Sequence, residues 1–121
     1  MTMQMVGEQL FVPDERAVEI YRVFARSVSA LAHVRLIVTR SQVAFWARHP
    51  FAYAWNPSRY ITSAVPMVVS VATNGPLSSS RIKEVVHPSP RTWMHHIELR
   101  SVTDVDEELL RWVVQAYQEA A

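Results

Sequence analysis

The spacing of apolar residues changes twice along this chain, and that change restricts the possible folds more than any other feature. From 14 to 32 apolar residues recur every three or four positions, as on one face of an α-helix. Between 34 and 55 they recur at every second position, as on a strand, and from 104 to 120 the helical spacing returns. This order predicts two amphipathic helices that flank a sheet.

The first helix is expected from Asp14 to Ala32, because Pro13 suits a first helical turn and the acids beside it favour the positive end of the helix dipole. The second is expected to begin at Asp104, with Glu107 as the reciprocal acid of an N-terminal cap. By the helical period, Trp112 should be partly exposed. The residues expected to be buried on that helix are Leu109, Val113 and Ala116.

Five strands are expected between the helices. Alternation marks the segments 34–38, 43–48 and 51–55, and the short turns between them favour consecutive antiparallel pairing. Segments 65–72 and 92–99 give two more strands, whereas 77–86 is expected to form one or two helical turns and 87–90 to be irregular. The predicted fold class is α+β: helix, five-stranded mainly antiparallel sheet, helix, with both helices on one sheet face.

Alternation also predicts which strand residues face the helices. The heavier apolar set should be the covered face: Val34, Leu36, Val38, Val43, Phe45, Phe51, Tyr53, Trp55, Met67, Val69, Val71, Trp93, Ile97 and Leu99. The open face should then carry Arg35, Thr39, Trp46, Arg48, Ala52, Ala54, Ser70, Met94, His96 and Glu98. A slip of one residue at any turn exchanges the two sets in the strand that follows.

Length and composition indicate one small domain. Residues 1–13 are expected to be a loosely ordered lead-in anchored by Leu10, Phe11 and Val12, and residues 14–121 a single α+β domain. Half of the residues are apolar, which is enough for a core without disulfide or metal. There is no Cys, which excludes disulfides and thiolate chemistry. No apolar run is long enough for a membrane span and residues 1–10 lack signal-peptide features, so a cytoplasmic protein without a membrane partner is expected.

Charge is sorted along the chain. No acid occurs from Ile20 to Lys83, whereas both ends are acidic. The basic residues of this middle stretch are Arg22, Arg26, Arg35, Arg40, Arg48, Arg59, Arg81 and Lys83. Such a basic middle indicates either an anionic partner or an internal charge match with the acidic ends.

Three functions are compatible with the predicted open face. Arg35 and Arg48 beside Trp46 resemble a stacking platform with a positive rim, so a non-enzymatic binding module for an anionic partner is favoured, with nucleic-acid backbone first. The alternatives are a small-molecule or enzymatic site around Trp46, Arg48 and His96, and a homodimer formed through the open face. The nucleic-acid hypothesis requires its candidates to share one surface, free of Asp106, Glu107 and Glu108. These candidates are Arg35, Arg40, Arg48 and Arg59.

Other chemistry has little support in the sequence. Adjacent residues of a strand point to opposite faces, so His95 and His96 cannot ligate one metal; one should lie in the core and the other outside, near Glu98. There is no Gly-x-Ser-x-Gly and no glycine-rich phosphate loop. We therefore expect no metal, no cofactor and no catalytic residue.

Three segments together resemble a known family. They are Phe51-Ala52-Tyr53-Ala54-Trp55-Asn56-Pro57-Ser58-Arg59-Tyr60 with the preceding strand, Thr92-Trp93-Met94-His95-His96-Ile97-Glu98-Leu99, and the stretch from Asp104 to Tyr117. This pattern is similar to an actinobacterial domain family of unknown function, found alone or at the C-terminus of longer proteins, some with predicted nuclease domains. Some members are labelled predicted transport proteins. The resemblance implies a small α+β domain and supplies no catalytic residue.

Overall fold

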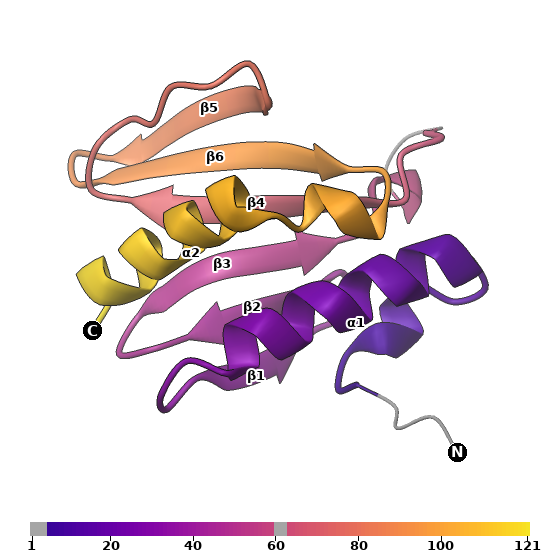
Figure 1. Cartoon of the computed structure of the whole chain (residues 1–121). Helices are drawn as coiled ribbons and strands as arrows, with labels where there is room; N and C mark the ends of the chain where they lie inside the picture. Colours follow the sequence, from indigo (N-terminus) through magenta and orange to yellow (C-terminus); the bar gives the residue numbers. More distant parts are fainter. Residues whose placement is uncertain (1–4, 60–62) are drawn as a thin grey trace.

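The computed structural model describes residues 5–59 and 63–121, and it is an α+β domain with both helices on one face of an antiparallel sheet (Figure 1). Helix α1 spans Glu15–Ser29 and α2 spans Glu107–Glu119. The strands are β1 (Arg35–Val38), β2 (Gln42–Trp46), β3 (Pro50–Trp55), β4 (Met67–Thr73), β5 (Ile82–Ser89) and β6 (Thr92–Leu99). Short 3-10 turns occupy Glu8–Leu10, Pro57–Arg59 and Val102–Asp104.

The sheet has six strands in the order β1-β2-β3-β4-β6-β5, so the prediction of five was wrong. The extra strand, β5, covers part of the segment expected to be helical and part of the one expected to be irregular. It pairs with β6 and lies at the edge of the sheet (Figure 1). Most of its side chains are exposed. An edge strand has no second neighbour and therefore needs no buried apolar alternation, and Pro88 is tolerated there for the same reason.

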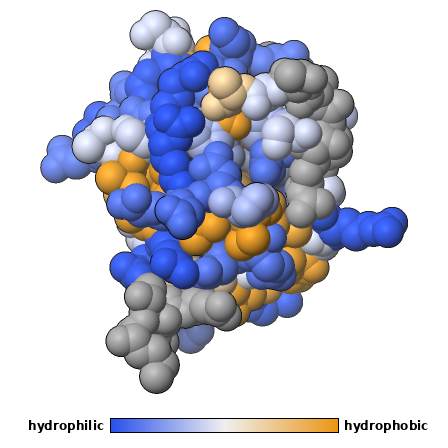
Figure 2. Space-filling model, turned by 90° about the vertical axis from the view of Figure 1, so that its right-hand side faces the viewer, coloured by the Kyte–Doolittle hydropathy of each residue, from blue (hydrophilic) through white to orange (hydrophobic). Residues whose placement is uncertain are grey.

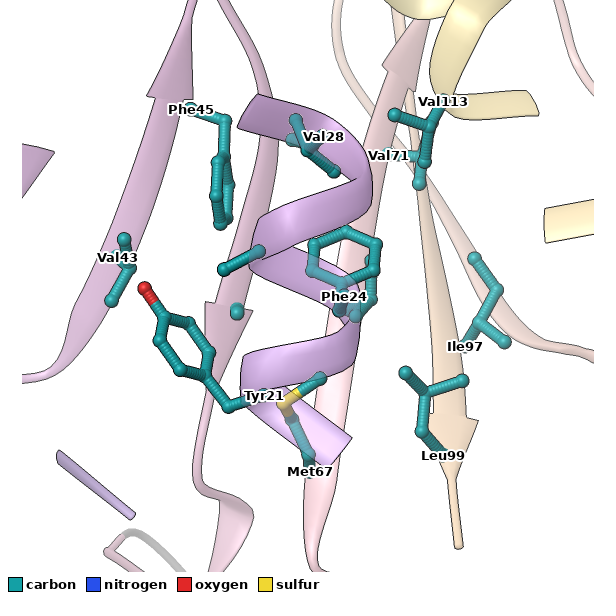
Figure 3. Close-up of a cluster of buried hydrophobic side chains, with 14 of the residues drawn as sticks. Tyr21, Phe24, Val28, Val43, Phe45, Met67, Val71, Ile97, Leu99 and Val113 are labelled. Carbon is teal, nitrogen blue, oxygen red and sulfur yellow. The ribbon is translucent and has the colours of Figure 1, made fainter. Parts of the chain in front are cut away.

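The core lies between the helices and one face of the sheet. Phe24 of α1 meets Phe45 of β2 edge to face, with ring centroids 5.5 Å apart. Figure 3 shows side chains of α1 and α2 converging on those of β2, β4 and β6. Fully buried members of this cluster include Tyr21, Phe24, Val43, Phe45, Met67, Val69, Val71, Ile97 and Leu99. The prediction that both helices cover one face is thus confirmed.

The facing of β3 differs from the prediction. Ala52 and Ala54 are fully buried and lie opposite Phe45 and Val43, whereas Tyr53 lies opposite Ala44 on the other face. The cause is a register shift at the turn, where Trp46 is paired with Pro50. One irregular residue moves every following side chain to the other face. Tyr53 and Trp55 therefore leave the predicted core face, and Ala52 and Ala54 leave the predicted open face.

The start of α2 also differs from the prediction. Asp106 is the N-cap, and its carboxylate accepts the amide hydrogen of Leu109 at 3.0 Å. Asp104 instead accepts the backbone N–H of Arg100 at 2.8 Å, within the preceding turn. The predicted cap at Asp104 was therefore wrong by two residues. The rotation of the helix is confirmed, because Leu109, Val113 and Ala116 are buried whereas Trp112 is half-buried.

The lead-in packs on the same core. Leu10 and Phe11 are buried, and the ring of Phe11 stacks on Tyr21 with centroids 4.9 Å apart. Val12 is 58% exposed and does not anchor the segment as expected. Glu8 contributes instead, because its carboxylate accepts two hydrogen bonds from Arg22, at 2.9 and 2.7 Å. The division of the chain at residue 13 stays a prediction.

Candidate functional site

The outer face, by which we mean the sheet surface turned away from α1 and α2, is the first candidate. Neither long helix lies over it (Figure 1). Strand register places on it Arg35, Ile37, Ala44, Trp46, Tyr53, Trp55, Ser70, Glu84, Met94, His96 and Glu98. Three of these are large aromatic rings from two neighbouring strands, β2 and β3. This face therefore combines flat apolar surface with polar groups, unlike the aliphatic core face.

Arg35 and Trp46 form a pair at one side of the outer face. They are direct neighbours across β1 and β2, and the Arg35 guanidinium carbon lies 5.6 Å from the Trp46 ring centroid. This distance allows a cation–π contact. Arg35 is solvent-exposed. The indole Nε1 of Trp46 is buried and has no hydrogen-bond partner within the described residues.

A hydrogen-bonded chain crosses the centre of the outer face. The indole N–H of Trp55 donates to the hydroxyl oxygen of Ser70 at 2.9 Å, and Ser70 Oγ lies 2.6 Å from His96 Nδ1. The other ring nitrogen of His96 lies 3.8 Å from the carboxylate of Glu84. Register explains the chain, because Ser70, His96 and Glu84 lie opposite one another on β4, β6 and β5. The sequence separation is large, so only strand pairing brings them together.

The electrostatics of this chain favour a neutral imidazole. Burial lowers the pKa of His96, the Glu84 carboxylate opposes that shift, and nearby His95 adds to it. Neutral His96 can accept the Ser70 hydroxyl hydrogen at Nδ1 and direct its Nε2 hydrogen toward Glu84. Although serine, histidine and a carboxylate also form hydrolase triads, Ser70 is only 3% exposed and lies in the middle of a strand. These hydrogen bonds orient the side chains of Trp55 and His96, and they do not present Ser70 as a nucleophile.

His95 and His96 lie on opposite faces, as alternation predicted. His95 is fully buried on the core side, where its Nδ1 contacts the Val71 carbonyl oxygen at 3.0 Å. Its Nε2 accepts the backbone N–H of Leu77 at 2.9 Å, which attaches the 74–81 loop to β6. These two bonds describe a neutral ring with its proton on Nδ1. The carboxylate that His96 contacts is that of Glu84; Glu98, two residues along the same face, contacts Arg100.

The four predicted arginines lie at two ends of the sheet. Arg35 and Arg48 lie at the sheet end where β2 finishes, whereas Arg40 lies in the turn before β2 begins. The backbone of Arg59 follows the end of β3, which is on the Arg40 side, and its side chain lies outside the described residues. The length of β2, at about 3.3 Å per residue, separates the two ends by about 13 Å. Trp46 is on β2 and Arg48 in the turn that follows it, whereas His96 is on β6, with β3 and β4 between them.

Part of the basic middle is matched by the acidic ends. Arg22 binds Glu8, and Arg81 contacts the carboxylates of Asp106 at 2.7 Å and Glu108 at 3.2 Å. The hydrogen bonds from Arg22 hold the pKa of Glu8 below its ordinary value. The Leu109 amide and then Arg81 do the same for the pKa of Asp106. The internal charge match thus accounts for Arg22 and Arg81, while Arg35 is on the outer face beside Trp46.

Sequence reasoning missed Tyr53, Trp55 and Glu84 as members of the outer face. The available signal was the alternation of alanine with aromatic residues from Phe51 to Trp55, which is compatible with either facing. Tyr53 is half-buried, and this burial raises the pKa of its hydroxyl above the ordinary value. The carboxylate partner of His96, Glu84, could not be found without the unpredicted strand β5.

Other surfaces offer less. Figure 2 shows the side of the molecule at the Arg40 end of the sheet. Hydrophilic residues cover most of this side, and a band of hydrophobic residues is visible between them. Among the described residues, no three His, Asp or Glu side chains converge as a metal site would require. No helix in the described part of the chain is both long and apolar enough to cross a membrane.

The comparisons with known proteins give a family without an activity. The chain belongs to the family described as Domain of unknown function (DUF5655), whose model matches residues 6–120. Neither the curated proteins nor the solved structures contain a match to the chain.

Proposed function

We propose that this DUF5655 domain is a non-enzymatic binding module whose outer face takes an anionic partner, with nucleic-acid backbone favoured. The observation that supports it is the Arg35–Trp46 pair at 5.6 Å, beside Tyr53 and Trp55 on the neighbouring strand. Aromatic rings on a sheet surface stack with unpaired bases, and an adjacent arginine attracts the phosphates. Single-stranded nucleic acid is thus the form that fits this surface.

The geometry of the rings supports stacking at more than one position. Tyr53 lies opposite Ala44, two residues before Trp46 on the same strand. Diagonal neighbours of this kind are about 7–8 Å apart across an antiparallel pair. Trp46 and Tyr53 are therefore separate platforms, and Trp55 continues them along β3. Each stacked base contributes about 1–3 kcal/mol in proteins of this kind.

The charged side chains determine where on the outer face a nucleic-acid strand would lie. Arg35 is at the β1–β2 side, and Arg48 follows β2 in the next turn, whereas Glu84 and Glu98 occupy β5 and β6. The acids repel phosphates, so we expect the nucleic acid over β1, β2 and β3 rather than over the whole sheet. With few cations at the surface, binding should be weak and insensitive to sequence, with a Kd of about 10⁻⁴ to 10⁻⁶ M.

The test is a titration of the protein with a fluorescent single-stranded oligonucleotide at several salt concentrations. We expect affinity to fall steeply with salt, through counterion release. Arg35→Ala combined with Arg48→Ala should lower the affinity and reduce the salt slope by about one unit for each phosphate that is no longer neutralised. Trp46→Ala should weaken binding with little change in slope, because stacking releases no counterion.

Arg111→Ala is the matched control, since this exposed arginine lies on α2, behind the sheet. Absence of binding at low salt, or an equal loss in the Arg111 control, would contradict the proposal. The outer face would then have one of its other two uses. Sedimentation showing a dimer that Trp46→Ala dissociates would identify it as a homodimer interface. A monomer that binds neither nucleic acid nor itself would leave the small-molecule or enzymatic site.

A further inference from the structure

A concave site, separate from the outer face, lies at the end of the sheet where α2 ends. It is a cavity of ≈ 570 Å³. Its lining residues come from the β2–β3 turn, the β5–β6 turn, the end of β4 and the last turn of α2. The polar side chains on its wall include His49, Asn74, Arg91, Thr92 and Glu119. Its volume lies within the range of about 300–1,000 Å³ that is usual for small-molecule sites.

The wall of this cavity is fixed by backbone contacts to the end of α2. The amides of Arg48 and His49 both donate to the carbonyl oxygen of Ala120, each at 3.1 Å. The amide of Asn74 donates to a carboxylate oxygen of Glu119 at 2.8 Å. These bonds hold the β2–β3 turn and the end of β4 against the same helical turn. A cavity with such a frame is preformed, which reduces the entropic cost of binding.

Two side chains of the cavity wall, those of Arg91 and His49, take no part in the contacts that hold the fold of the described residues. Arg91 lies in the two-residue turn that joins β5 to β6, directly after Pro90, and His49 directly precedes Pro50. Both side chains are exposed, and within the described residues neither has a carboxylate partner or a side-chain hydrogen bond. Pro90 and Pro50 restrict the backbone next to Arg91 and His49. An arginine held in this way offers a planar pair of donors to a carboxylate.

The end of α2, which is bonded to the β2–β3 turn and to the end of β4, is negative. Glu119 has its carboxylate at the cavity, where it also accepts a hydrogen bond from the Gln115 side chain at 3.2 Å. The C-terminal end of α2 adds a partial negative charge of about half an electron. A multiply charged anion would be repelled by this wall, whereas an ammonium group would be attracted. The cavity thus has a positive group at the β5–β6 turn, Arg91, and a negative region at the end of α2.

From this polarity we infer that the cavity binds a small zwitterion that carries one carboxylate and one ammonium group, as an amino acid or short peptide does. Arg91 holds the carboxylate, and Glu119 with the end of α2 holds the ammonium. The β2–β3 turn, which carries His49, lies on the far side of the β4 end from Arg91. The inference does not depend on the function proposed for the outer face, because Trp46, Tyr53 and Trp55 take no part in the cavity wall.

The experiment is a titration of the ¹⁵N-labelled full chain by NMR with glycylglycine, with acetate and methylammonium as probes of each half-site. We expect the largest shifts at 49, 74, 91 and 119, and tighter binding of glycylglycine than of either single-charge probe. Arg91→Ala should weaken glycylglycine about tenfold, the loss expected for a charge-assisted hydrogen bond. Arg26→Ala, which removes an equal exposed charge from α1, should have no effect.

Glu119→Gln gives the sharpest result, because the amide oxygen can still accept the Asn74 amide hydrogen while the negative charge is lost. Glycylglycine should bind several-fold more weakly to this variant, and acetate more tightly. Equal affinity for acetate and glycylglycine, or Glu119→Gln binding glycylglycine as well as the original chain, would overturn the proposal. Trp46→Ala should leave glycylglycine binding unchanged, so failure here is distinguishable from failure of the nucleic-acid proposal.

Discussion

The two faces of the sheet differ sharply although their residues alternate along the same strands. On the core face Val69 and Phe45 are completely buried among other apolar side chains. On the outer face their immediate neighbours, Ser70 and Trp46, meet polar or charged partners. Burying an apolar side chain stabilises a protein by about 1.5–3 kcal/mol, whereas one hydrogen bond adds about 1 kcal/mol. The core face therefore determines stability, and the outer face is free to carry binding chemistry.

The largest expected difference is between the adjacent residues Phe45 and Trp46. Phe45→Ala should lower the free energy of unfolding by about 3–5 kcal/mol, because it leaves a cavity against Phe24. Trp46→Ala should cost less than half as much, since this larger ring is already partly in contact with water. Urea unfolding monitored by circular dichroism measures both values. Equal losses would show that the outer face is as much a part of the core as the other.

The next effect tests how tightly the lead-in is held against the core face. A β-carbon at Gly7, where φ is 92°, would lie 2.6 Å from both the Tyr21 hydroxyl and a Val43 methyl. Gly7→Ala should therefore cost about 2–4 kcal/mol, from backbone strain and overpacking. Gly75→Ala is the control, because nothing lies within 4 Å of its added carbon. Thermal unfolding that shows two equal shifts would mean that the lead-in does not pack as described.

A smaller effect is expected at the start of the helix that covers β3 and β4. Asp106→Ala removes the cap of α2 and should cost about 1 kcal/mol. Its exposed contact with Arg81 adds little, because surface ion pairs are weak. Glu107→Gln, one residue later, is the control that keeps the cap but alters the charge. A melting temperature unchanged by Asp106→Ala would contradict the capping role.

The smallest effect concerns pH and the outer face alone. The pKa of His96 in the folded protein is lowered below 6.5, mainly by burial, so the unfolded chain takes up the proton first as the pH falls. Stability should accordingly decrease from about pH 6.5 down to the lowered pKa and then level off. Charges that act on the ring are Glu84, across the strand pair, and His95, on the core side.

His96→Gln should flatten the stability profile in that pH window while leaving the value above pH 7 nearly unchanged. Melting temperatures of both proteins between pH 5 and 8 provide the measurement. A parallel decrease in the two proteins would assign the acid sensitivity to other groups. Glu8 is one such group, but its lowered pKa places its own loss of stability below about pH 4.5.

Much of the framework follows from the sequence alone. The helical period of residues 14–32 and 104–120 depends only on side chains a few positions apart, and both helices were predicted, the second with its correct buried residues. Strands β1, β2, β3, β4 and β6 follow from local alternation in the same way. The opposite placement of His95 and His96 needed no more than the two-residue repeat of a strand. Local geometry determines these features, so local sequence was sufficient.

The candidate site depended on the tertiary structure. Alternation tells which residues of a strand share a face but not which face that is, and the irregular pairing of Trp46 with Pro50 decided it for Tyr53 and Trp55. The edge strand β5 lacks an apolar pattern because it has one neighbour only, so Glu84 could not be assigned to His96 in advance. The two charged residues of the cavity, Arg91 and Glu119, come from a hairpin turn and from the end of a helix. Contacts between residues far apart in the chain are set by strand order and packing, which no local pattern records.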